Sequence, residues 1–472
     1  MFRRMLGVTA LAVAAAAPLQ VRAQDAELSR IREEIRQLRE GYESRIQTLE
    51  RRLAEAEARG TRVEQAEQPA ATAAASAPAQ PSRESAFNPA VSLILQGTVA
   101  RSSRDPDSYQ ITGFAPSGAE VAPAPRGFSL GESELIGTAN IDPYFRGQLA
   151  AALTPQNELE VEEAFFQTLG LGHGFTAKGG RFLSGIGYQN ETHQHAWDFQ
   201  DAPLAYKAFL GGRWNDDGLQ LKWLAPSELF VELGAEVGRG RAFPSTDRSR
   251  NSAGAWSLFG HAGGDIGAST AWRAGLSYLR ASPRDRGFED LDSLGNPVAQ
   301  SFSGNSALWI ADFVVKWAPD GNAAATNFKL QGEYFRRNEK GSLAYDDTAQ
   351  AVPQFGAPLA GDYRSRQSGW YLQGVYQFVP HWRAGYRYDR LDSGRVDSAI
   401  VANGLGPTVS DFPLLMTEHN PTRHTAMLDW SPTEFSRLRL QFASDKSRIG
   451  VTDNQALLQY IFSLGAHGAH RF

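Results

Sequence analysis

The stretch Asn454-Gln455-Ala456-Leu457-Leu458-Gln459-Tyr460-Ile461-Phe462-Ser463-Leu464 decides the fold, together with Phe472 at the end of the sequence. Its side chains alternate between two kinds. One set is Gln455, Leu457, Gln459 and Ile461, and the other is Ala456, Leu458, Tyr460, Phe462 and Leu464. Successive side chains of a β-strand point to opposite faces, so this alternation predicts a strand with one fully apolar face.

The composition fits a membrane protein whose strands, rather than helices, cross the bilayer. The chain has 472 residues, is 42% hydrophobic and has a mean hydropathy of -0.37. Beyond the first 23 residues, no stretch approaches the roughly 20 apolar residues that a membrane helix needs. A barrel strand needs about 10 residues, of which every second one is apolar. A terminal aromatic residue behind such a strand predicts a bacterial outer-membrane β-barrel.

Several function classes are disfavoured by the residue content. The chain has no cysteine, which excludes disulfides and thiolate metal sites, and its net charge of -5 disfavours a nucleic-acid partner. The stretch Gly127-Phe128-Ser129-Leu130-Gly131 matches the nucleophile-elbow pattern, but it opens a strand and no helix follows it. The sequence therefore predicts no catalytic residue, no enzyme activity and no catalytic cofactor.

The first 86 residues divide into three segments. Residues 1–23 predict a signal peptide, because Arg3 and Arg4 precede an apolar run and Val21-Arg22-Ala23 offers a cleavage site. Residues 24–65 predict a periplasmic coiled coil. Its seam, spaced by three and four residues with one stutter, is Leu28, Ile31, Ile35, Leu38, Tyr42, Ile46, Leu49 and Leu53. An amphipathic helix packed on another surface is the alternative. Residues 66–86 form an Ala/Pro-rich linker.

Residues 87–472 predict a closed, all-β transmembrane barrel of about 16 antiparallel strands. The expected spans are 91–102, 128–140, 144–154, 158–169, 174–183, 216–225, 228–239, 252–265, 268–281, 305–318, 325–338, 367–379, 381–392, 422–431, 434–446 and 453–465. The connections alternate between long and short, apart from two brief ones on the long side. Long ones include 103–127, 184–215, 282–304, 339–366 and 393–421. Outer-membrane barrels have short periplasmic turns and long outer loops, so both ends of the barrel are expected in the periplasm.

The strands also predict a lipid face and a wetted lumen. Arg383, Arg387 and Asp389 alternate with aromatic and small residues, and a charge on the lipid face costs roughly 2–4 kcal/mol near the midplane. The residues predicted to line the pore are Arg383, Arg387, Asp389, Arg437, Arg439, Lys329, Glu333, Glu158, Glu160 and Glu162. Glu163 then points outward unless a bulge or a place near the rim intervenes.

The long connection 184–215 follows the fifth predicted strand. In 16-stranded general porins, the corresponding loop folds into the lumen. On that arrangement His193, His195, Trp197 and Asp198 form a constriction, with Lys207 and Arg213 nearby. Rings of charged side chains set ion selectivity. The alternative is that these charges only hydrate the wall, and the presence of both signs leaves the preferred ion open.

Histidine is scarce, with nine residues, and occurs in two close pairs. His193 and His195 lie near carboxylates in a loop, and His467 and His470 lie in the last residues. Imidazole and carboxylate groups suit Zn²⁺, so these four residues are the candidate zinc ligands. Ordinary hydrogen bonding is the alternative for the first pair, and an interface or barrel-closing role for the second.

The order of segments resembles that of the phosphate-selective porins O and P. A closer resemblance is to proteobacterial proteins labelled zinc-regulated TonB-dependent outer-membrane receptors. It rests on Phe87-Asn88-Pro89-Ala90-Val91-Ser92-Leu93-Ile94-Leu95-Gln96-Gly97, Glu162-Glu163-Ala164-Phe165, Gly180-Arg181-Phe182, His193-Gln194-His195-Ala196-Trp197-Asp198-Phe199 and the last Gly-Ala-His-Gly-Ala-His run. The second resemblance implies an outer-membrane barrel with a connection to zinc through the two His pairs.

These observations predict a porin-like channel in the outer membrane of a Gram-negative bacterium. It would allow passive diffusion of small hydrophilic solutes or ions, contact outer-membrane lipid and form a homotrimer through the coiled coil. A zinc-linked uptake receptor or transporter is the alternative. An outer-membrane lipase and a tether with a plugged barrel are the remaining hypotheses.

Overall fold

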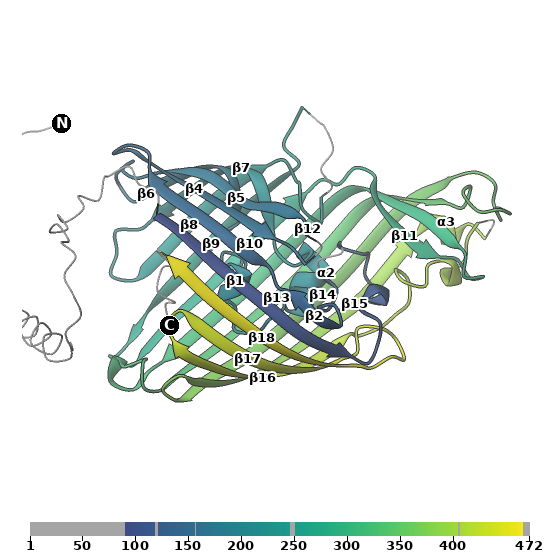
Figure 1. Ribbon diagram of the computed structural model, residues 1–472. Coiled ribbons are helices and arrows are strands. Elements are labelled where there is room, and N and C mark those ends of the chain that lie inside the picture. The colour runs from purple at the N-terminus through teal and green to yellow at the C-terminus, as the bar shows by residue number, and fades with distance from the viewer. Residues whose placement is uncertain (1–89, 119–120, 156, 246–250, 405, 466–472) are drawn as a thin grey trace, which may run out of the picture. The chain divides into compact units, whose positions relative to one another are not determined.

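The computed structural model describes residues 90–465, apart from 119–120, 156, 246–250 and 405. These residues form a closed antiparallel β-sheet (Figure 1). The predicted signal peptide, coiled coil and linker lie outside the described residues, as do His467 and His470. Within the described ranges, no helix is both long and apolar enough to cross a bilayer.

The strands occur in the positions that the alternation predicts. They are β1 (Ala90–Ser102), β2 (Gly127–Leu130), β3 (Ser133–Asn140), β4 (Phe145–Leu153), β5 (Leu159–Thr168), β6 (Phe175–Leu183), β7 (Asn215–Leu224), β8 (Phe230–Gly238), β9 (Ala255–Ile266), β10 (Thr270–Ala281), β11 (Arg286–Leu291), β12 (Pro297–Trp317), β13 (Asn327–Asp346), β14 (Leu359–Val379), β15 (Trp382–Ser398), β16 (Thr422–Thr433), β17 (Ser436–Asp445) and β18 (Asp453–Gly465). The helices are η1 (Pro106–Ser108), η3 (Gln194–Ala196), α2 (Leu204–Leu210), η4 (Pro319–Gly321), α3 (Ala399–Ala402) and η5 (Val409–Asp411).

The 18 strand segments fill sixteen positions around the barrel. β2 and β3 pair in turn along β1, and β10 and β11 pair in turn along β12, so each of these two pairs occupies one position. The barrel closes where β1 pairs with β18, with Leu95 opposite Phe462. The prediction of about 16 closed antiparallel strands is confirmed.

The two faces of the wall differ as the sequence predicts. Trp309, Tyr334 and Tyr386 are 46%, 45% and 50% exposed on the outer surface. Their chain neighbours Ile310, Phe335 and Arg387 are buried inside the barrel. The outer surface is therefore apolar where lipid would lie, whereas charged residues at that level of the strands, such as Arg387, point inward.

The connections are short at one end of the barrel and mostly long at the other. The short ones include 141–144, 225–229, 380–381 and 434–435, and the longest is 184–214. Because the number of positions is even, β1 begins and β18 ends on the side of the short connections (Figure 1). This asymmetry is typical of outer-membrane barrels, whose short turns face the periplasm.

Two predicted loops, 282–304 and 339–366, prove to be largely strand, and a third, 393–421, begins as strand. Residues 297–304, 339–346, 359–366 and 393–398 extend β12, β13, β14 and β15 beyond the apolar band. The inward side chains there, including Phe302, Tyr345 and Tyr363, pack with Ile400 and Phe412 of the loop after β15. Because the outward residues are polar, no lipid face marks these segments as strands in the sequence. The physical reason for the extension is this second apolar core.

Candidate functional site

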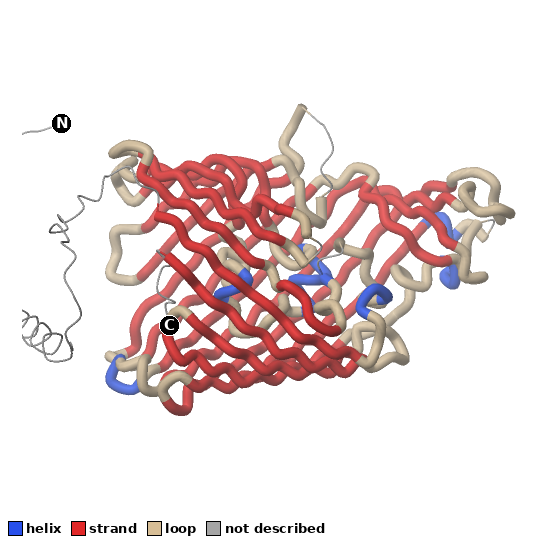
Figure 2. The backbone as a smooth tube through the Cα atoms, viewed as in Figure 1, coloured by secondary structure: helices blue, strands red, loops and turns tan. Residues whose placement is uncertain are grey.

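The connection between β6 and β7, residues 184–214, runs inside the barrel (Figures 1 and 2). All seven residues of its helix α2 are buried, and α2 packs against β13, β14 and β15. The loop therefore starts at β6 and reaches a wall that lies many strands away around the ring. It occupies the part of the lumen where the sequence predicts a constriction.

The local sequence determines where α2 begins and where it ends. Pro203 precedes the helix, and Gly211 follows it with a φ of 67°, a left-handed conformation that suits glycine. The backbone N–H of Leu204 donates to a carboxylate oxygen of Asp389 at 2.9 Å. A wall carboxylate thus satisfies one of the unpaired N–H groups at the start of the helix.

An apolar cluster holds α2 against the wall. Leu204 and Phe209 are completely buried among inward side chains of the wall, namely Leu308, Ile310, Phe335 and Leu391. The first long loop, residues 103–126, adds Phe114, whose ring centroid lies 5.6 Å from that of Phe209. The barrel interior is therefore not uniformly polar, because at this depth it contains a packed core.

Asp201 is the main ionic contact between the loop and the wall. Its carboxylate pairs with Arg387 at 3.3 Å, with Lys207 at 3.1 Å and with Arg423. Burial raises the pKa of Asp201, but Arg423, Lys207 and Arg387 together hold it well below the usual range. Asp201 is therefore ionised and compensates several buried cations at once.

Asp198 makes a second set of contacts with the same side of the barrel. It pairs with Lys329 at 2.9 Å and Arg383 at 3.2 Å. Burial raises the pKa of Asp198, and the two cations lower it to a greater extent, so the net pKa lies below its usual range. Arg437 and Arg439 donate to the backbone carbonyls of loop residues 195 and 197. The basic wall is thus covered by the loop.

Glu333 holds the loop from β13. It accepts hydrogen bonds from the hydroxyls of Tyr206 at 2.9 Å and Tyr371 at 2.6 Å, and from the backbone N–H of Gln189 at 3.0 Å. Gly187 has a φ of 70°, and a Cβ there would collide with the Glu333 carboxylate. A close approach of backbone to carboxylate therefore requires glycine at this position.

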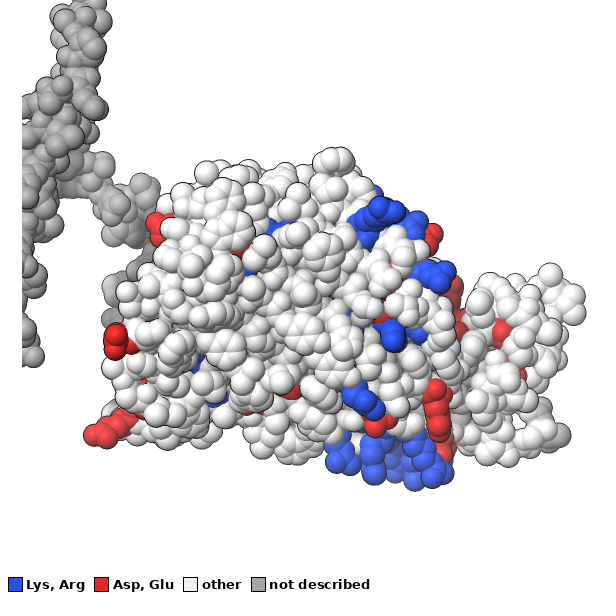
Figure 3. All heavy atoms as spheres, turned by 90° about the horizontal axis from the view of Figure 1, so that it is seen from below, with Lys and Arg blue, Asp and Glu red and all other residues white. Residues whose placement is uncertain are grey.

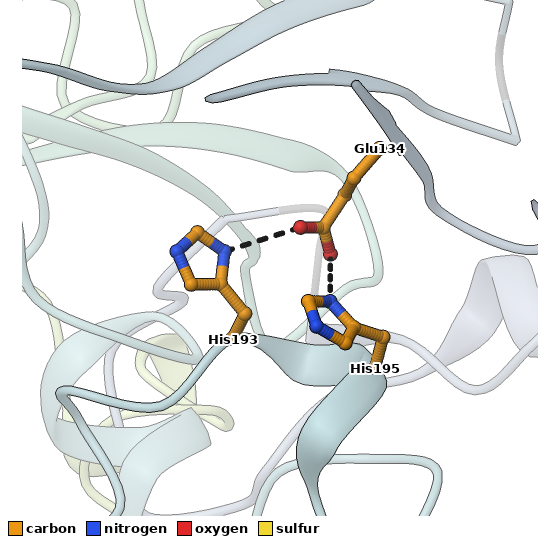
Figure 4. Close-up of side chains that lie close together, drawn as sticks. All are labelled: Glu134, His193 and His195. Atoms are coloured by element: carbon orange, nitrogen blue, oxygen red, sulfur yellow. Dashed lines mark hydrogen bonds and ion pairs between the residues drawn. The ribbon is translucent and has the colours of Figure 1, made fainter. Parts of the chain in front are cut away.

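At its other end the loop meets a carboxylate–histidine cluster made of Glu134, Glu162, Glu163, His193 and His195. Nδ1 of His193 lies 3.2 Å from Glu134 and 2.9 Å from Glu162, and its Nε2 lies 2.9 Å from Glu163. Nδ1 of His195 lies 2.9 Å from the other oxygen of Glu134 (Figure 4). The two imidazole rings stack with centroids 5.7 Å apart. The strands β3 and β5 thus supply the acids, and the loop supplies the imidazoles.

A β-bulge in β5 turns two consecutive acids inward. Ala150 pairs with Glu163 and Ala151 pairs with Val161, so Glu162 is the extra residue. The bulge puts both Glu162 and Glu163 inside, at 1% and 5% exposure. Of the two explanations that the sequence left open for Glu163, the bulge is the one found.

His193 stands between carboxylates on both sides of its ring. A neutral imidazole has one N–H and one lone pair, and here the lone pair would face a carboxylate oxygen. Burial lowers the pKa of His193, but the hydrogen bonds to Glu134 and Glu163 outweigh it and raise the pKa to about 10. Next to the cluster, Arg213 pairs with Glu162 and, at 2.8 Å, with Glu132. The cluster attracts a positive charge to the position of His193.

The structure brings one predicted metal pair together with a third donor. Ligand atoms of Glu134, His193 and His195 all lie within 4.8 Å of one another. A tetrahedral Zn²⁺ site places neighbouring ligand atoms about 3.3 Å apart, given metal–ligand distances of about 2.0–2.1 Å. Nδ1 of His195 and Nδ1 of His193 lie 2.9 Å and 3.2 Å from the two different oxygens of Glu134. One carboxylate and two imidazoles are a donor set that suits the ion.

The predicted pore-lining residues fall into three groups. Arg387, Asp389, Arg439 and Glu333 are at most 3% exposed beneath the loop. Arg383 and Lys329 are partly exposed and pair with Asp198, and Arg437 contacts the backbone of His195. In β5, Glu162 lies in the cluster, Glu160 pairs with Arg241 at 2.9 Å, and Glu158 is exposed just before the strand. The predicted arginines point into the barrel, but the loop lies between several of them and the open lumen.

A polar cavity of about 280 Å³ lies beside the loop on the wall made by β4, β5 and β6. Its charged lining residues are Arg146, Glu163, Lys178, Glu191 and His193. Three of these sit on strand segments near the short connections. The space left by the loop is thus on the side opposite to the basic wall that the loop covers.

Sequence reasoning missed Glu134, Asp201 and Arg423. Glu134 is completely buried and contacts both histidines. The signal for it was present, because Glu132 and Glu134 share one face of a predicted strand. Asp201 and Arg423 gave no such signal, since their pairing depends on where the loop crosses the barrel.

Known proteins resemble the chain in sequence or in fold. A protein of Aquifex aeolicus described as uncharacterized is 29% identical over 420 residues, which cover 83% of this chain and 81% of that protein. No family model matches the chain. Among solved structures, a loop-deletion form of OmpT of Vibrio cholerae has a TM-score of 0.49 at 9% identity over 80% of this chain and all of that one.

Two further solved structures are similar. OprB of Pseudomonas putida has a TM-score of 0.44 at 14% identity, covering 80% of this chain and 94% of that one. The anion-selective porin of Comamonas acidovorans has a TM-score of 0.46 at 9% identity, covering 80% and 99%. Independently of these, the closed sixteen-position barrel has an apolar outer band, an inward loop and short turns at one end. The described part of the chain is a closed antiparallel β-barrel with the features of an outer-membrane barrel.

Proposed function

We propose that the protein is a channel for the passive diffusion of small hydrophilic solutes or ions, with a passage along the wall of β4, β5 and β6. The observation that carries this proposal is the position of the inward loop. Ion pairs fasten the loop to the far wall, and the polar cavity of about 280 Å³ remains on the near side. No reaction is required, since the solute gradient supplies the free energy of transport.

The lining of the cavity supports polar solutes without a single preferred sign. Arg146 and Lys178 contribute positive charge, and Glu163 and Glu191 contribute negative charge. Such a lining hydrates solutes of either sign and excludes apolar ones, because an apolar solute makes no compensating contact there. The basic residues of β15 and β17 are covered by the loop and paired with its Asp198 and Asp201 or with Asp389 and Asp429 of the wall, so they do not form an exposed anion path.

We further propose that the protein is a homotrimer held together by a coiled coil of residues 24–65. The support is the heptad seam in the sequence, which one helix cannot bury alone. A solved OmpT structure is described as a trimer form.

Planar-bilayer recording of the purified full-length protein tests both statements. The expected result is discrete conductance steps that occur in groups of three equal levels. A variant lacking residues 25–63 should keep the size of each step but lose the grouping, and its SDS-resistant trimer should weaken. Heat-denatured protein is the control for detergent leakage.

Two outcomes would contradict the proposals separately. A correctly folded barrel that stays silent in the bilayer would exclude the channel and favour a plugged tether. If the grouping of steps and the trimer are unchanged in the deletion variant, the coiled coil does not hold the trimer together and would instead bind a partner protein. The channel proposal would then still stand.

Zinc-linked uptake is a second candidate function, and the carboxylate–histidine cluster is the observation that favours it. Glu134, His193 and His195 offer one carboxylate and two imidazoles, which suit Zn²⁺ better than Mg²⁺ or Ca²⁺. Arg213 pairs with Glu132 and Glu162, and the two histidines contact Glu134 and Glu163, so four carboxylates here meet one arginine and two imidazoles. A divalent ion would balance part of the remaining negative charge.

Isothermal titration of the detergent-purified protein with Zn²⁺ tests this candidate. The double change His193→Ala and His195→Ala should weaken zinc binding at least tenfold, because two of three donors are lost. His424→Ala is the matched control, since His424 is exposed on the outer surface and hydrogen-bonds only to Tyr386. Zinc affinity that is equal in all three proteins would leave the histidines as hydrogen-bonding residues of the loop.

A further inference from the structure

Three arginines point outward from adjoining strands just beyond the apolar band. Arg336 of β13, Arg366 of β14 and Arg390 of β15 are exposed, and we call them the basic belt. Figure 3 shows Lys and Arg gathered toward one end of the barrel surface, beside a broad area with few charged side chains. The basic belt lies on the side of the long connections, which is the outer side of the membrane.

The strand register places the basic belt directly against aromatic residues. Arg336 is opposite Trp309, and Arg390 is opposite Trp370. Trp370 is in turn opposite Tyr334, two residues before Arg336. On the outward face, basic residues therefore directly follow aromatic ones, either two residues along the same strand or opposite them on the neighbouring strand. Aromatic side chains of a barrel mark the interface between hydrocarbon and headgroups.

The dimensions place the basic belt at headgroup level. On β12, the exposed Trp309 and Trp317 are eight residues apart, which is about 27 Å along the strand and about 21 Å in height at a tilt near 40°. This matches the apolar band of about 25 Å. Arg336 and Arg366 lie two and four residues beyond Tyr334 and Trp370, or about 5–10 Å higher. The headgroup region of a bilayer leaflet is about 5–8 Å thick, so Arg336 lies within it and the Cα of Arg366 lies at its outer edge.

The basic belt has few acidic partners within the protein. Among the described residues, none of its three guanidinium groups forms an ion pair. The same outward face carries three more basic residues, Lys340, Arg364 and Arg395, and four acidic ones, Asp346, Asp362, Asp392 and Asp397. Of the acids, Asp397 already pairs with Arg395 at 2.9 Å. The six bases against four acids leave this face positively charged.

We propose that the basic belt binds the phosphate groups of the glycolipid headgroups in the outer leaflet. Guanidinium groups bind phosphate through paired N–H donors, and arginine suits this geometry better than lysine. Anionic headgroups attract basic residues that lie next to a membrane surface. The proposal concerns the outer surface and does not depend on the passage through the barrel.

Binding of bisphosphorylated lipid A to the full-length protein in detergent micelles tests the proposal. The triple variant Arg336→Gln, Arg366→Gln and Arg390→Gln should bind this lipid about tenfold more weakly. The control triple variant Arg104→Gln, Arg126→Gln and Arg284→Gln should stay within twofold, because these exposed arginines lie in loops. Lipid A without phosphates should bind weakly to all three proteins, and binding should fall as salt rises.

Further measurements distinguish binding of lipid A from binding of free phosphate or of another protein subunit. Inorganic phosphate at the lipid concentration should not displace lipid A, since it lacks the acyl chains that lie along the apolar band. Equal lipid A binding by the two triple variants, or equal binding of the dephosphorylated lipid, would overturn the proposal. So would a triple variant that binds lipid A normally but loses its trimer, because the basic belt would then be a protein interface. Heat-modifiable gel migration verifies folding, and single-channel conductance should not change.

Discussion

Alanine at Asp201 is expected to release the inward loop and to lower the free energy of unfolding of the barrel by about 3–5 kcal/mol. Asp201 compensates Lys207, Arg387 and Arg423, which are at most 2% exposed. Removing the carboxylate leaves these buried cations without their main partner, and the loop loses the ion pairs of Asp201 with β15 and β16. Urea titration of the barrel in detergent measures the stability, and bilayer recording should show larger and more variable steps.

Asp397→Ala is a control that removes the same charge, and it distinguishes the effect of losing Asp201 from that of losing an aspartate elsewhere. Asp397 pairs with Arg395 on the outer surface, and both side chains are more than half exposed. Asp397→Ala should therefore change stability by less than about 1 kcal/mol, as exposed pairs do. If Asp201→Ala were as stable as the control and conducted like the wild-type protein, Asp201 would not be what keeps the loop in place.

Alanine at Gly180 is expected to distort the bulge in β5 and to destabilise the barrel by about 2–6 kcal/mol, from backbone strain of about 1–3 and overpacking of about 1–3 kcal/mol. Gly180 has a φ of 127°, and a Cβ there would collide with the carbonyl oxygen of Ala164. Gly180 pairs with Phe165, close to the bulge at Glu162. Glu162 and Glu163 should then shift away from His193.

Gly137→Ala is the control for this change. Gly137 lies in β3, and a Cβ there would meet no atom within 4 Å. The control should keep both its unfolding midpoint and its zinc affinity, whereas Gly180→Ala should lose stability and, if the cluster binds zinc, affinity as well. An unaltered midpoint for Gly180→Ala would show that β6 adjusts around the new methyl group.

The strands of this barrel are predictable because residues that face lipid must be apolar and those that alternate with them face a wetted lumen. In β15, Arg387 and Asp389 alternate with Tyr386 and Tyr388, and only one choice of face keeps the charges out of lipid. The same reasoning gives the number of strand positions and the end at which the long loops lie. It fails for residues 339–346 and 359–366, because strands outside the bilayer have no lipid face to reveal them.

The interior of the candidate site is less predictable, because it depends on contacts between residues far apart in the sequence. The sequence indicates that Arg387 points inward, but not that Asp201 covers it. One local signal was available. Residues 307–311, Ala-Leu-Trp-Ile-Ala, are apolar on both faces, which indicates that something packs against the inner face at that depth. The identity of that element, α2, does not follow from the strand itself.

The two-ended attachment of loop 184–214 has a mechanical consequence. Neighbouring strands of a barrel can hinge about their hydrogen bonds, so an empty ring resists flattening poorly. Here one segment is bonded at one end to β3 and β5 and at the other end to β13, β15 and β16. Squeezing the ring across this span, or widening it, strains buried ion pairs, so the segment acts as a strut that fixes the cross-section.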